Sequence, residues 1–156
     1  MKIRTRARYS LRFMIALGKL SSDGDPVGLG DISRQSGISR RYLDHLVVPL
    51  KNASLIRGRS GRAGGYVLAK QTNEIKLGDI IEAAIGPIAI TDCAVEPELC
   101  MFSDFCNCKD LWMLINHRIT AVLDEYTLAD MLNNSWSKKV KEELHRMDEK
   151  RSLVTH

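Results

Sequence analysis

A glycine turn joins two short amphipathic segments in the first third of this sequence. Residues 29–36 predict a short helix, and Gly37 then supplies a tight turn. Ser39 is a favourable N-cap for a second helix. The apolar residues of this second segment recur at helical spacing: Tyr42, Leu43, Leu46, Val47 and Leu50. Two short helices joined by a glycine-containing turn predict a helix-turn-helix.

A hairpin rich in glycine and arginine follows this helix pair directly. Residues 55–59 and 66–68 predict short strands, and residues 60–65 form the loop between them. A helix-turn-helix followed by a basic hairpin is the arrangement of a winged helix. An ordinary helical domain with one hairpin is the alternative, which the Gly37 turn and the arginine-rich tip disfavour. We therefore expect a mostly α fold with a small β-hairpin, namely a winged helix-turn-helix domain plus a long dimerisation helix.

The whole chain of 156 residues divides into four predicted regions. Residues 1–90 form the winged helix-turn-helix domain, with further helices at 8–20 and 77–85 and a wing at about 55–69. Residues 91–109 lack periodicity and form a cysteine-bearing loop. Residues 110–134 form the dimerisation helix and a short packing helix, whose start has a capping-box-like pair, Thr127 and Asp130. Residues 135–156 are charged and poorly patterned, so we expect a flexible tail.

The long helix carries an apolar stripe that is broad for a surface helix of a small chain. This width favours packing against a second copy, and packing on its own domain is the alternative. The predicted dimerisation residues are Leu111, Trp112, Ile115, Ile119, Val122, Leu123 and Tyr126.

Charge is distributed unevenly along the chain. Residues 1–70 contain 14 Lys and Arg against four acidic residues, a net charge of +10, whereas the remainder carries −6. This asymmetry favours a polyanion-binding module over a merely solvated basic face. No stretch approaches the ~18 apolar residues needed to cross a bilayer. The basic, then apolar, N-terminus resembles a signal peptide, but Arg12 interrupts the apolar run, so we expect a helix in a cytosolic protein.

All four cysteines lie between Cys93 and Cys108, in the spacing Cys-x6-Cys-x5-Cys-x-Cys. Such clustering favours local metal or redox chemistry over a disulfide framework. The absence of a Cys-x2-Cys pair weakens a zinc-ribbon interpretation. An iron–sulfur cluster, structural zinc, a thiol–disulfide switch and inert cysteines all remain open on this pattern alone.

Four segments together resemble the IscR/NsrR/CymR-type winged-helix transcription regulators. They are residues 2–12, 38–44, 61–68 and 126–130, and the resemblance covers about residues 1–134. It implies a homodimer that binds double-stranded operator DNA. In the cysteine-bearing branch of that family, three cysteines hold an iron–sulfur cluster, and Cys93, Cys100 and Cys106 match them.

The usual fourth ligands of that family are missing from this chain. Lys109 stands where IscR-like members have a histidine, and Arg8 stands where NsrR-like members have an acid. Cys108 is an additional cysteine in the right loop and is the favoured fourth ligand. We favour a 2Fe–2S over a 4Fe–4S cluster.

The helix-turn-helix and the wing supply the predicted DNA contacts. Arg40, Arg41, Tyr42 and Asp44 are expected to enter the major groove, although the two arginines alternatively touch only phosphates. Arg62 is expected in the minor groove, and the wing glycines either allow close approach to DNA or serve the turn only. The full predicted set is Arg4, Arg34, Ser39, Arg40, Arg41, Tyr42, Asp44, His45, Arg57, Arg59, Arg62 and Gly64.

These features predict a DNA-binding transcription regulator. We expect it to be a repressor, and we expect an iron–sulfur cluster to control its affinity for the operator. A cluster-free thiol- or zinc-dependent regulator of the same fold, or an iron–sulfur redox enzyme, are the alternatives. No phosphate loop, nucleophile elbow or catalytic His/acid pair is evident, so we expect no enzymatic activity. We expect a prokaryotic protein that lies in the cytoplasm and is associated with the nucleoid when it binds DNA. We expect neither a membrane nor a small-molecule substrate among its partners.

Overall fold

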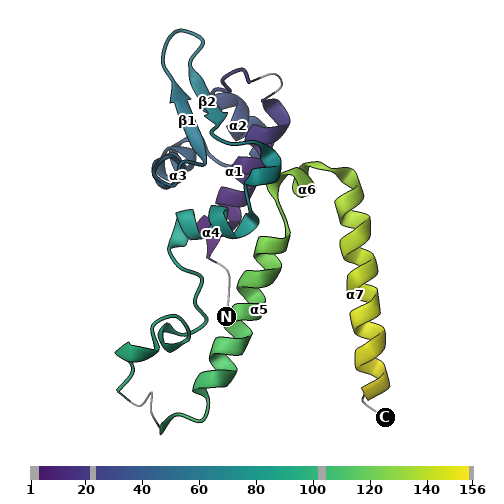
Figure 1. Cartoon of the computed structure of the whole chain (residues 1–156). Coiled ribbons are helices and arrows are strands. Elements are labelled where there is room, and N and C mark those ends of the chain that lie inside the picture. Colours follow the sequence, from purple (N-terminus) through teal and green to yellow (C-terminus); the bar gives the residue numbers. More distant parts are fainter. Residues whose placement is uncertain (1–3, 22–23, 102–104, 155–156) are drawn as a thin grey trace.

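The computed structural model describes residues 4–21, 24–101 and 105–154 (Figure 1). Its α-helices are α1 (Thr5–Leu20), α2 (Leu29–Ser36), α3 (Arg40–Asn52), α4 (Leu77–Ile85), α5 (Lys109–Glu125), α6 (Leu128–Leu132) and α7 (Asn134–Val154). The strands are β1 (Ile56–Arg59) and β2 (Gly65–Leu68), and 3-10 turns lie at η1 (Thr72–Glu74), η2 (Asp92–Ala94) and η3 (Pro97–Leu99). The expected class, mostly α with one hairpin, is confirmed.

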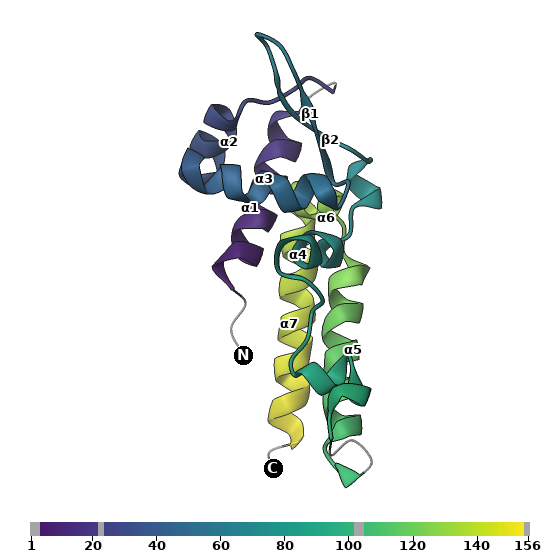
Figure 2. The same cartoon turned by 90° about the vertical axis from the view of Figure 1, so that its left-hand side faces the viewer.

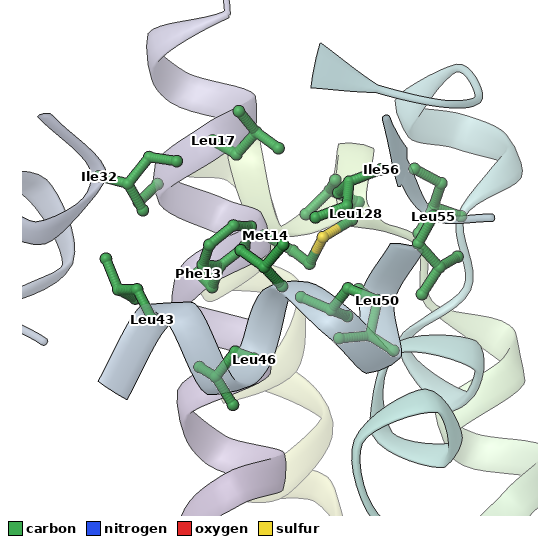
Figure 3. Packing of buried hydrophobic residues seen from close by; sticks show 14 of the residues in the cluster. Phe13, Met14, Leu17, Ile32, Leu43, Leu46, Leu50, Leu55, Ile56 and Leu128 are labelled. Atoms are coloured by element: carbon green, nitrogen blue, oxygen red, sulfur yellow. The ribbon is translucent and has the colours of Figure 1, made fainter. Parts of the chain in front are cut away.

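The helices α1–α4 and the hairpin, which we call the head, surround one hydrophobic core. Helix α1 lies at its centre, and α2, α3, α4 and α6 all pack against it. Figure 3 shows the side chains that meet there. The largest fully buried residues include Phe13, Met14, Leu17, Ile32, Leu43, Leu46, Leu50, Leu55, Ile56 and Leu128. Burial of these apolar side chains orients α3 with its opposite face outward.

The helix-turn-helix forms where the sequence predicts it. Gly37 adopts a left-handed conformation with φ of 67°, and its amide donates to the carbonyl of Ser33 at 2.9 Å. Glycine reaches this region without steric penalty, which lets α2 end there. The Ser39 side chain then accepts a hydrogen bond from the amide of Tyr42 at 3.4 Å and caps α3.

The wing is a two-stranded antiparallel hairpin attached to the chain that precedes α2. Residues Ile56 and Arg59 pair with Leu68 and Gly65, respectively. Val27 and Tyr66 exchange two backbone hydrogen bonds of 2.9 Å, which hold β2 against the body of the head. A Cβ atom at Gly65 would collide with the Val27 carbonyl. This glycine is therefore required by the packing of the wing itself.

The long helix α5 is anchored to the head at its C-terminal end. The amide of Leu77 donates to the carbonyl of Tyr126 at 3.0 Å, and the amide of Leu128 donates to the carbonyl of Ile75 at 2.8 Å. The predicted capping box of Thr127 and Asp130 starts α6. Figures 1 and 2 both show α5 extending from the head toward the segment that carries the cysteines.

Helix α7 occupies most of residues 135–156, for which the sequence predicts a flexible tail; residues 155 and 156 lie outside the described residues. A regular helix runs from Asn134 to Val154, although its apolar patterning is weak. Its sequence is rich in strong helix formers, and pairs one turn apart support it: Arg146 with Glu143, and His145 with Glu149. Local propensity thus forms a helix whose tertiary contacts lie mainly with α6. Within the described residues, no helix is long and apolar enough to traverse a membrane.

Candidate DNA-binding surface and cysteine segment

One face of α3 is exposed and carries most of the residues predicted to read bases. Arg41, Asp44, His45 and Val48 follow each other at three- and four-residue steps, and all four are exposed. Arg40 is exposed beside them at the first position of the helix. The spacing places these side chains on one stripe of α3, opposite the buried Leu43, Leu46, Val47 and Leu50.

Tyr42, also predicted to contact DNA, is half-buried and packs within the head. Its ring lies edge-on to the ring of Tyr9, with centroids 5.2 Å apart. The guanidinium of Arg12 lies 5.4 Å from the centroid of Tyr9 and donates a hydrogen bond to the carbonyl of Ser36. Together these contacts join α1, the end of α2 and the start of α3. Tyr42 therefore contributes to the packing of α3 against α1.

The remaining predicted DNA contacts are spread over the head. Arg4 precedes α1 and is exposed, and exposed Ser39 caps α3. Arg34 is exposed in α2 and forms an ion pair with Asp31 one turn earlier. Arg59 and Arg62 are exposed in the wing, while Gly64 is half-buried, and a Cβ atom there would collide with the carbonyls of Arg59 and Gly61.

A basic cavity at the base of the wing adds two residues that sequence reasoning missed. Lys51 at the end of α3 and Lys70 after β2 line this cavity of about 600 Å³ together with Arg57. The Arg57 guanidinium donates to the carbonyl of Ala69 at 2.6 Å, which fixes its side chain. The three cations come from segments that only the fold brings together. Their exposure and positive charge suit a phosphate group.

The structure separates the four cysteines into two pairs. Cys93 and Cys100 are half-buried and line an open cavity of about 600 Å³, which Asp92 and Glu96 also line. Cys106 and Cys108 lie at the N-terminal end of α5, where the amide of Lys109 donates to the Cys106 carbonyl at 3.1 Å and the amide of Trp112 donates to the Cys108 carbonyl at 3.0 Å.

The donor chemistry of this segment fits a thiophilic metal group, but its present shape does not assemble a complete site. All four thiols are free; Cys106 is half-buried, Cys108 is exposed, and the Cys93 Sγ lies 3.3 Å from the Thr91 hydroxyl. Among the described residues, no three Cys, His, Asp or Glu side chains lie close enough to share a metal ion.

A buried amide side chain of α5 holds the residue that directly precedes the cysteine segment, residues 91–108. The backbone amide of Ile90 donates to Asn116 Oδ1 at 3.0 Å. Asn116 is 7% exposed and is the one buried residue within α5. This contact was absent from the sequence analysis, although a lone asparagine in an apolar helical stripe is a sign of such a role.

The predicted dimerisation residues form an apolar surface that the described part of the chain leaves partly open. Leu111, Trp112 and Val122 are 51%, 37% and 52% exposed. The other four, Ile115, Ile119, Leu123 and Tyr126, are half-buried. Helix α5 contacts mainly α4 and η2, and part of this surface stays exposed in the part of the chain that the structure describes.

Comparisons with known proteins agree with this architecture. Residues 3–134 match the Rrf2 family model, described as an iron-dependent transcriptional regulator. The chain is 37% identical over 131 residues to the HTH-type transcriptional regulator CymR of Bacillus subtilis (84% of this chain, 89% of the relative). It is 32% identical over 155 residues to the HTH-type transcriptional regulator IscR of Citrobacter koseri (99% of this chain, 94% of the relative).

Solved structures show the same likeness in three dimensions. B. subtilis CymR, described as the global cysteine regulator, superposes with a TM-score of 0.68 at 36% identity and covers 85% of this chain and 96% of its own. IscR of T. potens gives a TM-score of 0.68 at 34% identity, covering 86% and 88%. The expected family resemblance is confirmed: the chain belongs to the Rrf2 family of winged-helix, DNA-binding transcription regulators.

Proposed function

We propose that this regulator controls its operator affinity through an iron–sulfur cluster held by Cys93, Cys100 and Cys106, with Cys108 as the fourth ligand. The carrying observation is that four free thiols lie within the segment that links the head to α5. The iron-dependent description of the family supports the same choice. A bound cluster supplies a group that responds to iron supply and oxidants.

Ligation draws the two cysteine pairs together and so orders the segment between α4 and α5. Metal binding to a site that is not preformed couples ligation to folding of the loop. Cys108 is the N-cap of α5 and the Cys106 carbonyl accepts from the amide of Lys109, so ligation of these two cysteines acts at the start of this helix. Asp92 and Glu96 beside the first pair keep the segment hydrated and are not assigned as ligands.

The proposed DNA contacts follow from the exposed stripe of α3 and from the wing. Arg41 and Asp44 enter the major groove, where arginine suits guanine and a carboxylate accepts from the amino group of cytosine. Arg62 at the wing tip approaches the minor groove. Lys51, Arg57 and Lys70 bind a backbone phosphate between these two contacts.

The proposed homodimer forms through α5. Pairing of two symmetry-related helices covers the apolar surface around Val122 and presents two copies of α3 to half-sites about one DNA turn, or a multiple, apart. Because α5 is bonded to the head through Tyr126 and Leu128, a shift of α5 changes the relative orientation of the heads. A differential stabilisation of about 1.4 kcal/mol would change operator affinity tenfold.

Anaerobic purification tests the proposal directly. We expect iron and sulfide in a 1:1 ratio, a visible absorption band, and operator affinities that differ between cluster-loaded and cluster-free protein. Two irons per chain would identify the 2Fe–2S form and four the 4Fe–4S form. Protein that binds operator DNA equally well with and without iron and sulfide would contradict cluster control while leaving DNA binding intact.

A thiol switch is the second candidate, because Cys93 and Cys100 line the same cavity. A peroxide would oxidise both thiols to one disulfide and be reduced to water, and no metal is needed. The description of a structural neighbour as a cysteine regulator makes sulfur-linked control a reasonable alternative. Mass spectrometry of peroxide-treated, metal-free protein separates the candidates: a Cys93–Cys100 disulfide that alters operator binding favours the switch.

A further inference from the structure

Val48 is an apolar side chain on an otherwise polar surface of the head. It is 59% exposed, and it is the only large apolar side chain of the described head residues, up to residue 90, that is exposed to this degree. The aliphatic side chains of Leu43, Leu46, Val47 and Leu50 in the same helix are buried in the core. The fold of the head therefore gives no reason for a valine at this position.

The position of Val48 relates it to the proposed base-reading residues. It follows Arg41, Asp44 and His45 by seven, four and three residues, so it lies on the same exposed stripe of α3. Valine is a weaker helix former than the lysine, glutamate or arginine usual at exposed positions. Single exposed apolar residues are common, and they need no explanation when they lie outside a functional surface. Val48 lies at the C-terminal end of the stripe that carries the proposed base-reading residues.

We propose that Val48 reads thymine in the operator by packing against its 5-methyl group. This inference rests on the proposed role of α3 in the major groove. There, the thymine methyl is the only apolar group that unmodified base pairs present. One valine flanked by His45 and Lys51 is too small and too polar a surface for a protein partner, since stable protein interfaces need about 800 Å² per partner.

The expected contribution is modest and measurable. Burial of one methyl group is worth about 0.8 kcal/mol, which corresponds to about a fourfold change in affinity per contacted thymine. Loss of the contact should change preference at one or two base pairs of each half-site. It should leave the number of phosphate contacts, and hence the salt dependence of binding, unchanged.

The test combines uracil substitution with variants of the full-length dimer. Operator sequences are first selected from a random pool of double-stranded DNA with the wild-type protein. Each thymine of a selected site is then replaced by uracil, which removes only the methyl group. We expect the wild type to lose about fourfold in affinity at one or two positions per half-site. Val48→Ser should be insensitive there, and Val48→Ile, the matched control, should keep the sensitivity.

Each possible result either supports or contradicts the proposed contact between Val48 and thymine. Equal uracil penalties for wild type and Val48→Ser overturn the inference while leaving sequence-specific DNA binding by α3 intact. A wild type that enriches no sequence from the pool overturns the proposed function and this inference with it. Circular dichroism and thermal melting establish that both variants fold, so a weakened Val48→Ser protein is compared with itself across thymine and uracil sites.

Discussion

The backbone amide of Ile90 donates a 3.0 Å hydrogen bond to the side-chain oxygen of Asn116, and the two residues are 26 positions apart. Ile90 directly precedes the cysteine segment, and Asn116 lies near the middle of α5. The bond therefore fixes the start of the cysteine segment relative to α5, the helix that follows the end of this segment. In the proposed switch, this fixed end would direct a change in the shape of the segment toward α5.

Replacing Asn116 tests this coupling. Asn116→Ala removes the acceptor and leaves the half-buried Ile90 amide unpaired, which should cost about 1–2 kcal/mol of unfolding free energy. Urea denaturation measures this loss, and hydrogen exchange of the Ile90 amide should become faster. Asn116→Asp keeps an acceptor at the same place and should retain slow exchange. Equally slow exchange in Asn116→Ala would show that the contact is not needed to hold the segment.

The cysteine variants test the proposed ligand set. Cys106→Ala should abolish the visible absorption band and uncouple operator binding from iron supply, because three thiolates are the minimum of the proposed site. The dimer should persist in light scattering, since Cys106 lies outside the apolar surface of α5. Cys108→Ala tests the fourth ligand alone, and we expect this variant to lose the cluster. An unchanged spectrum and stability would move the fourth ligand to water, to Lys109 or to the partner subunit.

Gly65 should tolerate no side chain. Gly65→Ala brings a Cβ into the carbonyl of Val27, so either the Val27–Tyr66 bridge opens or β2 shifts. We expect a loss of roughly 1–3 kcal/mol in stability, as for other overpacked sites, and weaker operator binding through a displaced wing. Gly30→Ala is the control, because its Cβ meets no atom within 4 Å. Wild-type stability and affinity in Gly65→Ala would contradict the packing role.

Arg62 should contribute through charge at the wing tip. Arg62→Ala should weaken operator binding and reduce the slope of log affinity against log salt by about 0.9 if one phosphate contact is lost. Fluorescence anisotropy at several salt concentrations measures both quantities. Lys138→Ala removes the same charge from exposed α7 and should change neither. An unaltered affinity and slope in Arg62→Ala would remove the wing tip from the DNA contacts.

The apolar surface of α5 should be required for assembly. Val122→Glu places a charge in a contact that is buried in the proposed dimer, so we expect monomers or aggregates in light scattering and loss of operator affinity. Asn73→Glu adds the same charge to an exposed position of η1 and should leave the dimer unchanged. A Val122→Glu protein that remains a dimer and binds DNA normally would move the interface to another surface.

The local features of this protein could be predicted from its sequence. The Gly37 turn, the Ser39 cap, the Thr127–Asp130 capping box and the hairpin each depend on residues a few positions apart. Backbone conformational preferences and short-range hydrogen bonds act within one turn, so the order of residues is enough to define them. The helical periodicity of the sequence likewise predicted which face of α3 would be exposed.

Other features depended on tertiary packing. Lys51 and Lys70 share a cavity only because the end of α3 lies beside the base of the wing, and Asn116 reaches Ile90 only because α5 packs against the start of the cysteine segment. The spacing of the cysteines in the sequence also did not predict that Cys93 and Cys100 would line one cavity without Cys106 and Cys108. These contacts join residues that are distant in the chain, and which of them meet is decided by how the helices bury their apolar faces.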